Sequence, residues 1–182
     1  VTGDKAHADR AAAILARFAS LIPNWPIWAP YYGPQANKTS MSQSNPATFQ
    51  QEFAAGLWGD WIYMDLVMGT PLVQAYAYIQ PAGSTKALNA DVAINAMFDL
   101  HIATQRKYNP GPDFSNMDAF RIRGFMDFGR LLLDPELVHE GVRHLQNMYR
   151  VGYYADGWWH EGATSYHLDL QNGLRAIAND LL

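Results

Sequence analysis

The sequence predicts an all-α protein built from stacked helical hairpins. Apolar residues recur at the spacing of amphipathic helices over most of the 182 residues. The sequence has no pair of segments in which apolar and polar residues alternate on either side of a tight turn, so no β-hairpin is expected. One junction, at Asp134, joins two helical patterns so closely that the helices must form an antiparallel pair. No repeat of fixed length is visible, which disfavours a regular solenoid, and we expect residues 1–182 to form a single α-helical domain.

The first expected helix covers residues 4–22, where an alanine-rich background carries a clear apolar stripe. Pro23 ends this helix. Residues 24–46 combine turn-forming residues with interleaved aromatic side chains, which is typical of an ordered loop at the surface or beside a cleft. A helix over 48–55 follows, and the glycines on either side of Trp58 favour a bend that exposes its indole ring.

The middle of the chain predicts two further helical regions. Residues 61–79 are rich in apolar side chains but contain Gly69 and Pro71, so they form either one kinked helix or two helices that meet at Gly69. The next pattern predicts a single helix over residues 85–107, ended by the turn sequence that starts at Asn109.

Three helices are expected in the last third of the chain. One begins after Ser115 or Asn116, either of which can serve as its N-cap. Asp134 and Pro135 start the next helix as N-cap and first helical residue, and the final helix begins near Ser165. Their expected apolar faces are Ile122, Phe125, Met126, Gly129, Leu132 and Leu133; Val138, Val142, Leu145 and Tyr149; and Leu170, Leu174, Ile177 and Leu181.

Composition narrows the classes of partner. The net charge is −4 and the basic residues are scattered, so no nucleic-acid partner is expected. No segment approaches the ~20 apolar residues needed to span a bilayer, and a secretory signal, if the protein has one, lies outside these residues. The lack of cysteine excludes disulfides and thiolate metal sites. The high aromatic share is partly core and partly typical of grooves that stack on sugar rings.

Residues 155–167 form the densest group of reactive and stacking side chains in the sequence. Tyr166 is the candidate catalytic residue, because it stands at a helix start, where backbone N–H groups lower the cost of forming a phenolate. An unperturbed tyrosine has a pKa near ~10, so action as a base needs such help. Asn116 is the second candidate, since its amide could donate a hydrogen bond to a ligand carboxylate. The structural alternatives are a tyrosine that covers the core and an asparagine that only caps its helix.

Other side chains are candidates for binding the substrate. Glu161 could also act as a general acid, as a hydrogen-bond partner for a tyrosine or histidine, or simply as a charge matched to a helix N-terminus. Arg121 and Arg123 could bind an anionic substrate or lie in solvent. The substrate-binding set predicted from the sequence is Trp158, Trp159, His160, Glu161, His167, Arg121, Arg123, Trp58 and Trp61. For Trp158 and Trp159 a position in the core is the alternative.

No metal and no cofactor are predicted. His160 and His167 lie seven residues apart across a turn, which is not the spacing that places two ligands on one helix face. His139 and His144 fall among Glu and Arg residues in a helix and are expected in solvent. No glycine-rich phosphate loop or Gly-x-Ser-x-Gly turn is present in the sequence.

Three segments stand out together: Ser115-Asn116-Met117, then Gly-Arg-Leu-Leu-Leu-Asp-Pro-Glu-Leu at 129–137, then Asp-Gly-Trp-Trp-His-Glu-Gly-Ala-Thr-Ser-Tyr-His at 156–167. In this order they resemble the heparinase II/III-like polysaccharide lyases, including the related alginate lyases. In that family an Asn comes first, a Leu-Asp-Pro junction follows, and a Ser-Tyr-His run carries the catalytic tyrosine. The resemblance is specific over residues 113–182 and looser upstream.

The resemblance implies an incomplete (α/α) toroid of antiparallel helical hairpins that performs β-elimination on an acidic, uronic-acid polysaccharide, alginate-like or glycosaminoglycan-like. Asn116 would neutralise the uronate carboxylate, and Tyr166 would protonate the leaving oxygen. Many members carry a His directly after the Asn, where this chain has Met117. The base is therefore either Tyr166 itself or a His outside these residues.

The same resemblance implies that these residues belong to a larger enzyme. Its remaining toroid helices and a C-terminal β-sandwich would be further partners of this domain, in the periplasm or outside the cell, and a homodimer is left open. Two other functions are considered. One is a toroidal glycoside hydrolase, which needs a carboxylate pair drawn from Asp60, Asp156 and Glu161. The other is a helical module that binds carbohydrate without chemistry.

Overall fold

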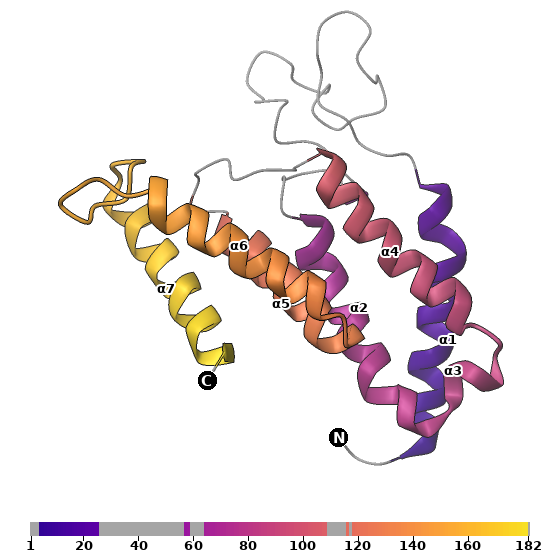
Figure 1. The fold of residues 1–182 in the computed structure, drawn as a ribbon. Helices are drawn as coiled ribbons and strands as arrows, with labels where there is room; N and C mark the ends of the chain where they lie inside the picture. Colours follow the sequence, from indigo (N-terminus) through magenta and orange to yellow (C-terminus); the bar gives the residue numbers. More distant parts are fainter. Residues whose placement is uncertain (1–3, 26–56, 59–63, 109–115, 117, 182) are drawn as a thin grey trace, which may run out of the picture. The chain divides into compact units, whose positions relative to one another are not determined.

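The structure of the protein is a computed structural model that describes residues 4–25, 57–58, 64–108, 116 and 118–181 (Figure 1). Over these residues the chain is mostly helical and has no β-strand, which confirms the all-α class. None of the described helices is long and apolar enough to cross a membrane.

The chain divides into two compact units, Val1–Asn109 and Pro110–Leu182. Each unit has its own buried core, which the following paragraphs describe in turn. The expectation that residues 1–182 form one domain stays a prediction.

The first unit is a small helical assembly in which α1 contacts α2, α3 and α4. Its elements are α1 (Lys5–Leu21), η1 (Ile22–Asn24), α2 (Met64–Ile79), η5 (Gln80–Ala82), α3 (Ser84–Ala87) and α4 (Asp91–Tyr108). Asp4 caps α1, because its carboxylate accepts the Ala6 N–H at 2.8 Å. The core of this unit includes Leu15, Val73, Ile94, Met97 and Phe98.

Two expectations for this unit are settled by the helix boundaries. α2 continues through Gly69 and Pro71, so the region is one helix rather than two. The single helix expected over 85–107 is wrong, because α3 and α4 are separate. The break lies at Asn89, whose φ of 50° is left-handed, and the N–H of Ala90 turns back to the carbonyl of Thr85 at 3.0 Å. Asparagine tolerates this conformation better than most residues, so the turn has a local cause. The helix expected over 48–55, and the loop expected over 24–46 apart from its first two residues, lie outside the described part of the chain.

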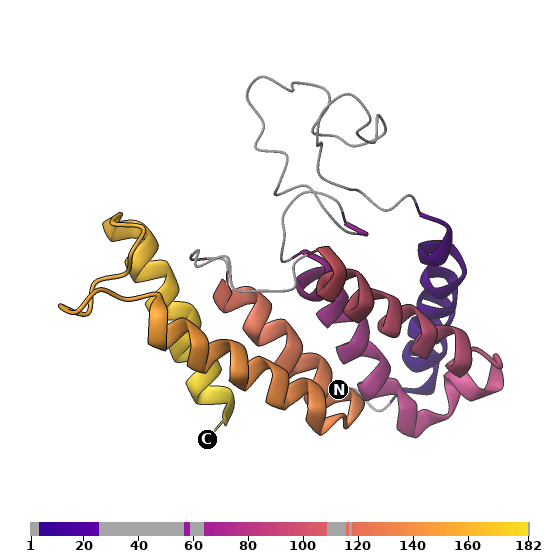
Figure 2. The ribbon, with the colours of Figure 1, turned by 45° about the horizontal axis from the view of Figure 1, so that its top comes forward.

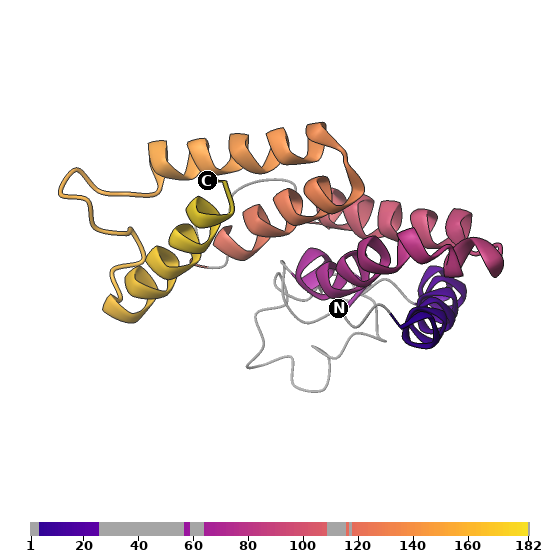
Figure 3. The same cartoon turned by 90° about the horizontal axis from the view of Figure 1, so that it is seen from below.

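The second unit consists of α5 (Asp118–Leu132), α6 (Pro135–Val151) and α7 (Thr164–Leu181). Figures 2 and 3 show α5 and α6 side by side. A methyl group added at Gly129 would meet Val138, and one added at Gly141 would meet Met126. The contacts therefore pair later residues of one helix with earlier residues of the other, which confirms the antiparallel hairpin.

Asp134 starts α6 as predicted. Its Oδ1 accepts the N–H of Glu136 at 2.9 Å, with the N–H of Leu137 at 3.4 Å, and Pro135 occupies the first helical position. α7 begins at Thr164 and buries Leu170, Leu174 and Ile177, as the sequence predicted.

The buried face of α6 differs from the predicted one. Leu137, Gly141 and Met148 are buried, whereas the predicted stripe is half-buried at Val138, Val142 and Leu145 and exposed at Tyr149. The reason is close packing at glycine. A Cβ at Gly141 would lie 3.1 Å from the carbonyl oxygen of Ile122, so α6 meets α5 through residues that a pattern of large apolar side chains does not count.

Leu133 is a second difference. It was expected on the apolar face of α5, yet it is 87% exposed and has a φ of 60°. The left-handed conformation ends the helix before Leu133 and turns its side chain into solvent.

Candidate functional site

The turn between α6 and α7 is an ordered structure built largely from its own backbone. An isolated antiparallel bridge joins Tyr153 to Trp159. The N–H of Tyr154 donates to the carbonyl of Trp158 at 2.9 Å, and Asp156 Oδ1 accepts the N–H of Trp158 at 3.0 Å. Gly157 takes the left-handed φ of 83° that this tight reversal needs. The turn is therefore an ordered, hydrogen-bonded structure rather than an open linker.

Trp159 is part of the core and not of the surface. Its side chain is completely buried and packs with Met126, Met148, Leu170, Leu174 and other apolar residues of all three helices. The edge of its ring meets Tyr153 with the ring centroids 5.2 Å apart. Trp159 was predicted to bind substrate, but a ring with no exposed face offers no stacking surface, so its role here is to anchor the turn.

Glu161 connects this anchored turn to the segment before α5. Its Oε2 accepts the backbone N–H of Asn116 at 2.7 Å and the indole N–H of Trp159 at 2.6 Å. Asn116 lies 45 residues away in sequence and is only 8% exposed. The carboxylate thus brings one predicted site residue against the turn that leads to the other. Among the described residues, this backbone donation is the one hydrogen bond recorded for Asn116.

Asn116 does not act as the N-cap of α5. The helix begins at Asp118, two residues later, so Asn116 does not directly precede it. Ser115 and Met117 lie outside the described residues.

Trp158 of this turn and His167 of α7 form a stacked pair. Their rings are nearly parallel, at 2°, with centroids 4.4 Å apart. The backbone N–H of Trp159 donates to Nδ1 of His167 at 3.2 Å. Because Nδ1 accepts this hydrogen bond, the proton of the neutral ring must sit on Nε2. Trp158 is 36% exposed, so it offers an aromatic surface at the edge of the site.

Tyr166 is the third residue of α7 and its side chain is 45% exposed, so it is accessible to a ligand. Tyr153 contrasts with it. Burial raises the pKa of Tyr153 to about 12, with the nearby Tyr149 adding to the shift, and its hydroxyl accepts a hydrogen bond from Gln171 at 3.3 Å. Tyr153 is therefore protonated at neutral pH.

His160 lies beside the indole of Trp159, and its backbone carbonyl accepts a hydrogen bond from the hydroxyl of Tyr154 at 3.1 Å.

The two candidate arginines have different environments. Arg121 is completely buried and pairs with Asp118 at 2.5 Å, with both side chains 1% exposed. Its charge is neutralised inside the unit, so it does not meet a ligand at the surface as predicted. Arg123 has a side chain 48% exposed and lies 3.6 Å from Asp127.

His144 is not in solvent as the sequence suggested. Its ring stacks on Phe125 with centroids 5.5 Å apart, and only 16% of the side chain is exposed. Burial lowers the pKa of His144, and the positive charge of Arg121 lowers it further, while Glu140 acts in the opposite direction. His139 has a side chain 63% exposed, in agreement with the expectation.

Trp58 belongs to the first unit, where its indole N–H donates to Nε2 of His101 at 3.0 Å. Its ring meets Trp25 edge-on with centroids 5.1 Å apart. The ring is half-buried rather than presented to solvent as the flanking glycines suggested. His101 is buried, and its Nδ1 lies 2.7 Å from the carbonyl of Met97. Trp61, the other predicted tryptophan, lies outside the described residues.

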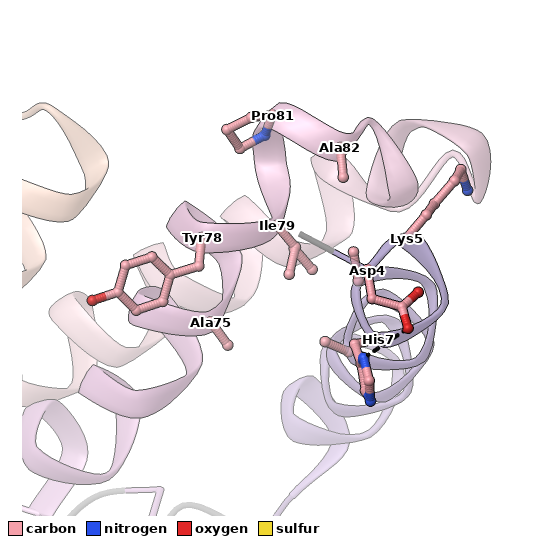
Figure 4. A pocket seen from close by; sticks show the side chains of 10 residues that line it. Asp4, Lys5, His7, Ala75, Tyr78, Ile79, Pro81 and Ala82 are labelled. Atoms are coloured by element: carbon pink, nitrogen blue, oxygen red, sulfur yellow. Dashed lines mark ion pairs between the residues drawn. The ribbon is translucent and has the colours of Figure 1, made fainter. Parts of the chain in front are cut away.

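One hollow of about 700 Å³ lies in the first unit, between the start of α1 and the end of α2 (Figure 4). Ala8, Ala75 and Ile79 are among the residues that line it, and Tyr78 stands at its edge. None of the predicted site residues within the described part of the chain lines this hollow. In the part of the chain that the structure describes, no group of three His, Asp or Glu side chains is placed to hold a metal ion.

Sequence reasoning missed two features of this region. Asp118 as the partner of Arg121 could have been found, because the two residues are three apart on one helix. The link from Glu161 to Asn116 left no such signal, because it uses a backbone N–H. Comparisons with protein-family models, curated proteins and solved structures gave no match.

Proposed function

We propose that the protein is a polysaccharide lyase that cleaves a uronic-acid-containing polysaccharide, alginate-like or glycosaminoglycan-like, by β-elimination. The observation that carries the proposal is the position of Glu161, whose carboxylate ties Asn116 to the turn that leads directly into Tyr166. These are the two residues that the chemistry needs, and they come from distant parts of the sequence. The phenol of Tyr166 is exposed, so it is accessible to a sugar substrate.

In this mechanism Asn116 donates its side-chain amide to the uronate carboxylate. That hydrogen bond stabilises the enolate-like intermediate formed when the C5 proton leaves. The C5–H bond breaks, the C4–C5 double bond forms, and the C4–O bond to the leaving sugar breaks. Tyr166 protonates the leaving oxygen, and Tyr166 or a histidine takes the C5 proton. The ring of Trp158 stacks on His167 and is partly exposed, so it is suited to hold a neighbouring sugar ring.

The proposal includes the larger architecture. The hairpin of α5 and α6 is the repeating unit expected of an (α/α) toroid, and we propose that these helices form part of one. We likewise propose that further toroid helices and a β-sandwich complete the enzyme, and that it acts in the periplasm or outside the cell.

A glycoside hydrolase fits the site less well. Such an enzyme needs two carboxylates that face the scissile bond. Oδ1 of Asp156 is engaged by the N–H of Trp158, and Oε2 of Glu161 is engaged by two N–H groups. Asp60, the third carboxylate considered, lies outside the described residues.

A carbohydrate-binding module without chemistry is favoured by one observation, the partly exposed ring of Trp158. Such a protein would need the aromatic surface but not an accessible phenol, so the proposal is tested at Tyr166.

The test uses the full-length protein with alginate, heparin and hyaluronan in separate reactions. A lyase produces an unsaturated sugar that absorbs in the ultraviolet. New reducing ends without that absorbance would indicate a hydrolase, and binding without either product would indicate the module.

The catalytic residue is tested with Tyr166→Phe, which keeps the ring and removes the hydroxyl. We expect a loss of at least about 100-fold in kcat, the lower range for a proton-transfer group. Tyr149→Phe is the matched control, because Tyr149 is also exposed in the same unit and lies outside the proposed site. Full lyase activity in Tyr166→Phe would refute the assignment.

A further inference from the structure

The contacts of Glu161 assign it a role that differs from those the sequence suggested. We infer that Glu161 is a positioning residue, which fixes the backbone of Asn116 so that its side-chain amide meets the carboxylate of the substrate. This inference rests on the proposed lyase function. It gives Glu161 no contact with the reacting atoms.

The first argument is that one oxygen joins two parts of the chain. Oε2 of Glu161 accepts the N–H of Asn116 at 2.7 Å and the indole N–H of Trp159 at 2.6 Å. Hydrogen bonds to a charged acceptor are shorter and stronger than neutral ones. Both distances fall within the short range, so the carboxylate is a firm connection between the two donors.

The second argument concerns the rigidity of the anchor. Trp159 is completely buried among residues of α5, α6 and α7. A ring in such a core has little freedom to move. Through Glu161, the backbone of Asn116 is tied to a fully buried side chain of the turn and not to a surface residue.

The third argument favours this role over the other roles considered for Glu161. The residue precedes α7, which begins at Thr164, and its carboxylate bonds to Asn116 and Trp159 rather than to the first N–H groups of that helix. A general acid must direct its carboxyl oxygen to the substrate. Here Oε2 faces two protein donors, which makes a supporting role the better description.

The same contacts reach the other side of the site. The backbone N–H of Trp159 donates to His167, the residue after Tyr166. Trp159 is therefore hydrogen-bonded on one side to the carboxylate that fixes Asn116 and on the other to the first turn of α7. Loss of Glu161 removes the connection on the Asn116 side and leaves Tyr166 in place.

The expected consequence is kinetic. A small displacement of a group that stabilises a transition state can lower the rate by about 100-fold. We expect Glu161→Ala to lower kcat by about that factor, with a smaller change in KM, because the amide of Asn116 acts mainly on the charge that develops during the reaction. Glu161→Gln keeps an acceptor oxygen in the same place, so it should restore most of the lost rate.

The experiment measures kcat and KM of the full-length protein and both variants on the uronan that the wild type cleaves. Glu136→Ala is the control, because its side chain is 79% exposed and lies on α6 away from the turn. In parallel, hydrogen exchange of the Asn116 amide and the Trp159 indole is followed by nuclear magnetic resonance. Both protons should exchange faster in Glu161→Ala and stay protected in Glu161→Gln.

The two readouts separate the failure of this inference from the failure of the proposed function. A wild-type protein that forms no unsaturated product contradicts the lyase, and exchange at Asn116 then still decides whether Glu161 fixes it. An active wild type with unchanged kcat in Glu161→Ala overturns the inference alone. If Glu161→Ala does not fold, Glu161→Gln decides: a rate as low as that of Asn116→Ala, in a folded protein, shows that the carboxylate does more than position.

Discussion

Gly152 shows how a single residue sets the position of the candidate site. A Cβ at this position would collide with the ring of Trp159 and would lie 2.8 Å from the carbonyl oxygen of Met148. Its φ of −89° is open to any residue, so the requirement for glycine comes from space and not from backbone strain. Because the ring of Trp159 takes this space, its indole N–H can reach Glu161.

We therefore expect Gly152→Ala to destabilise the protein by about 1–3 kcal/mol through overpacking. Denaturant unfolding gives the free energy, and near-ultraviolet circular dichroism reports the tryptophan environment. Gly157→Ala is the comparison, since nothing lies within 4 Å of a Cβ there and its φ is 83°. It should cost about 1 kcal/mol through strain and leave the tryptophan signal unchanged. Equal spectra for the two variants would contradict the packing argument.

Substitution of Asn116 can distinguish a catalytic role of this residue from a structural one. Removal of a hydrogen-bond donor that stabilises developing negative charge lowers kcat by about 100- to 1,000-fold. We expect Asn116→Ala to show this loss with a change in unfolding free energy below about 1 kcal/mol, since the residue does not cap α5. Asn172→Ala, at an exposed position of α7, is the control. A stability loss without a rate loss would instead assign Asn116 to the fold.

The sequence predicted the identity of the site residues better than their surroundings. Tyr166 and Asn116 stand in motifs that can be read directly, and the helix start close to Tyr166 follows from local patterning. The sequence left open whether Trp159 lies in the core or contacts substrate, because its burial depends on the space at Gly152, seven residues earlier. The role of Glu161 depends on a backbone donor in a distant segment, which no residue type reveals.

In the α5–α6 hairpin, α6 has a favourable N-cap, whereas the residue that follows the end of α5 has a strained backbone. Asp134 caps α6 in the way its sequence dictates. Leu133, directly before it, has a φ of 60°, a conformation that costs a side-chain-bearing residue about 1–2 kcal/mol. Its side chain is 87% exposed, so it contributes little packing in return.

Leu133→Gly should accordingly stabilise the protein. The relief of strain exceeds the added entropy of the unfolded chain, and we expect a gain of about 0.5–1 kcal/mol in unfolding free energy. Asn89→Gly tests the same conformation in the first unit, at a φ of 50°. Its gain should be smaller, because asparagine tolerates the left-handed region. Thermal and denaturant unfolding both measure the difference, and a loss of stability in Leu133→Gly would show that its exposed side chain makes a stabilising contact.

The buried face was predicted correctly where it is built from large apolar residues, as in α7. In α1 the helix was predicted but its apolar stripe was not fully buried, because Ile14 and Leu21 are exposed and the buried residues are Ala12, Leu15 and Ala19. Helix patterns failed at two kinds of place. At Asn89 a turn interrupts a pattern that otherwise continues, because backbone conformation and not polarity ends α3. On α6 the contact face includes Gly141, and glycine adds nothing to an apolar count although it permits the closest approach.

At the scale of the whole molecule, each compact unit holds a histidine, His101 or His144, whose pKa is lowered by burial. In the first unit the carbonyl of Met97 can only accept and the indole N–H of Trp58 can only donate, so His101 carries its proton on Nδ1 and is neutral. Burial lowers the pKa of His101, although the Met97 carbonyl acts in the opposite direction. Burial also lowers the pKa of His144 in the second unit, and Arg121 and Arg143 add to this effect while Glu140 opposes it.

These two histidines predict a loss of stability in mild acid. A histidine whose pKa is lower in the folded protein than the unfolded value of 6.5 binds its proton more readily in the unfolded chain. Stability is therefore complete above pH 6.5 and falls as the pH drops below it, by at most about 1.4 kcal/mol per pH unit for each histidine. Between pH 6.5 and about 5 most carboxylates stay ionised, so this window isolates the histidines.

Hydrogen exchange measured by mass spectrometry can follow the two units separately through peptides from α4 and α6. We expect His101→Gln to flatten the pH dependence of α4 protection and His144→Gln to flatten that of α6. The slope is the quantity to compare, because either substitution also changes stability at neutral pH. His7→Gln is the control, since His7 has a side chain 74% exposed and should leave both slopes unchanged. If each substitution flattened both slopes equally, the two units would unfold as one cooperative domain, as the sequence first suggested; if neither slope changed, the acid sensitivity would arise from other groups.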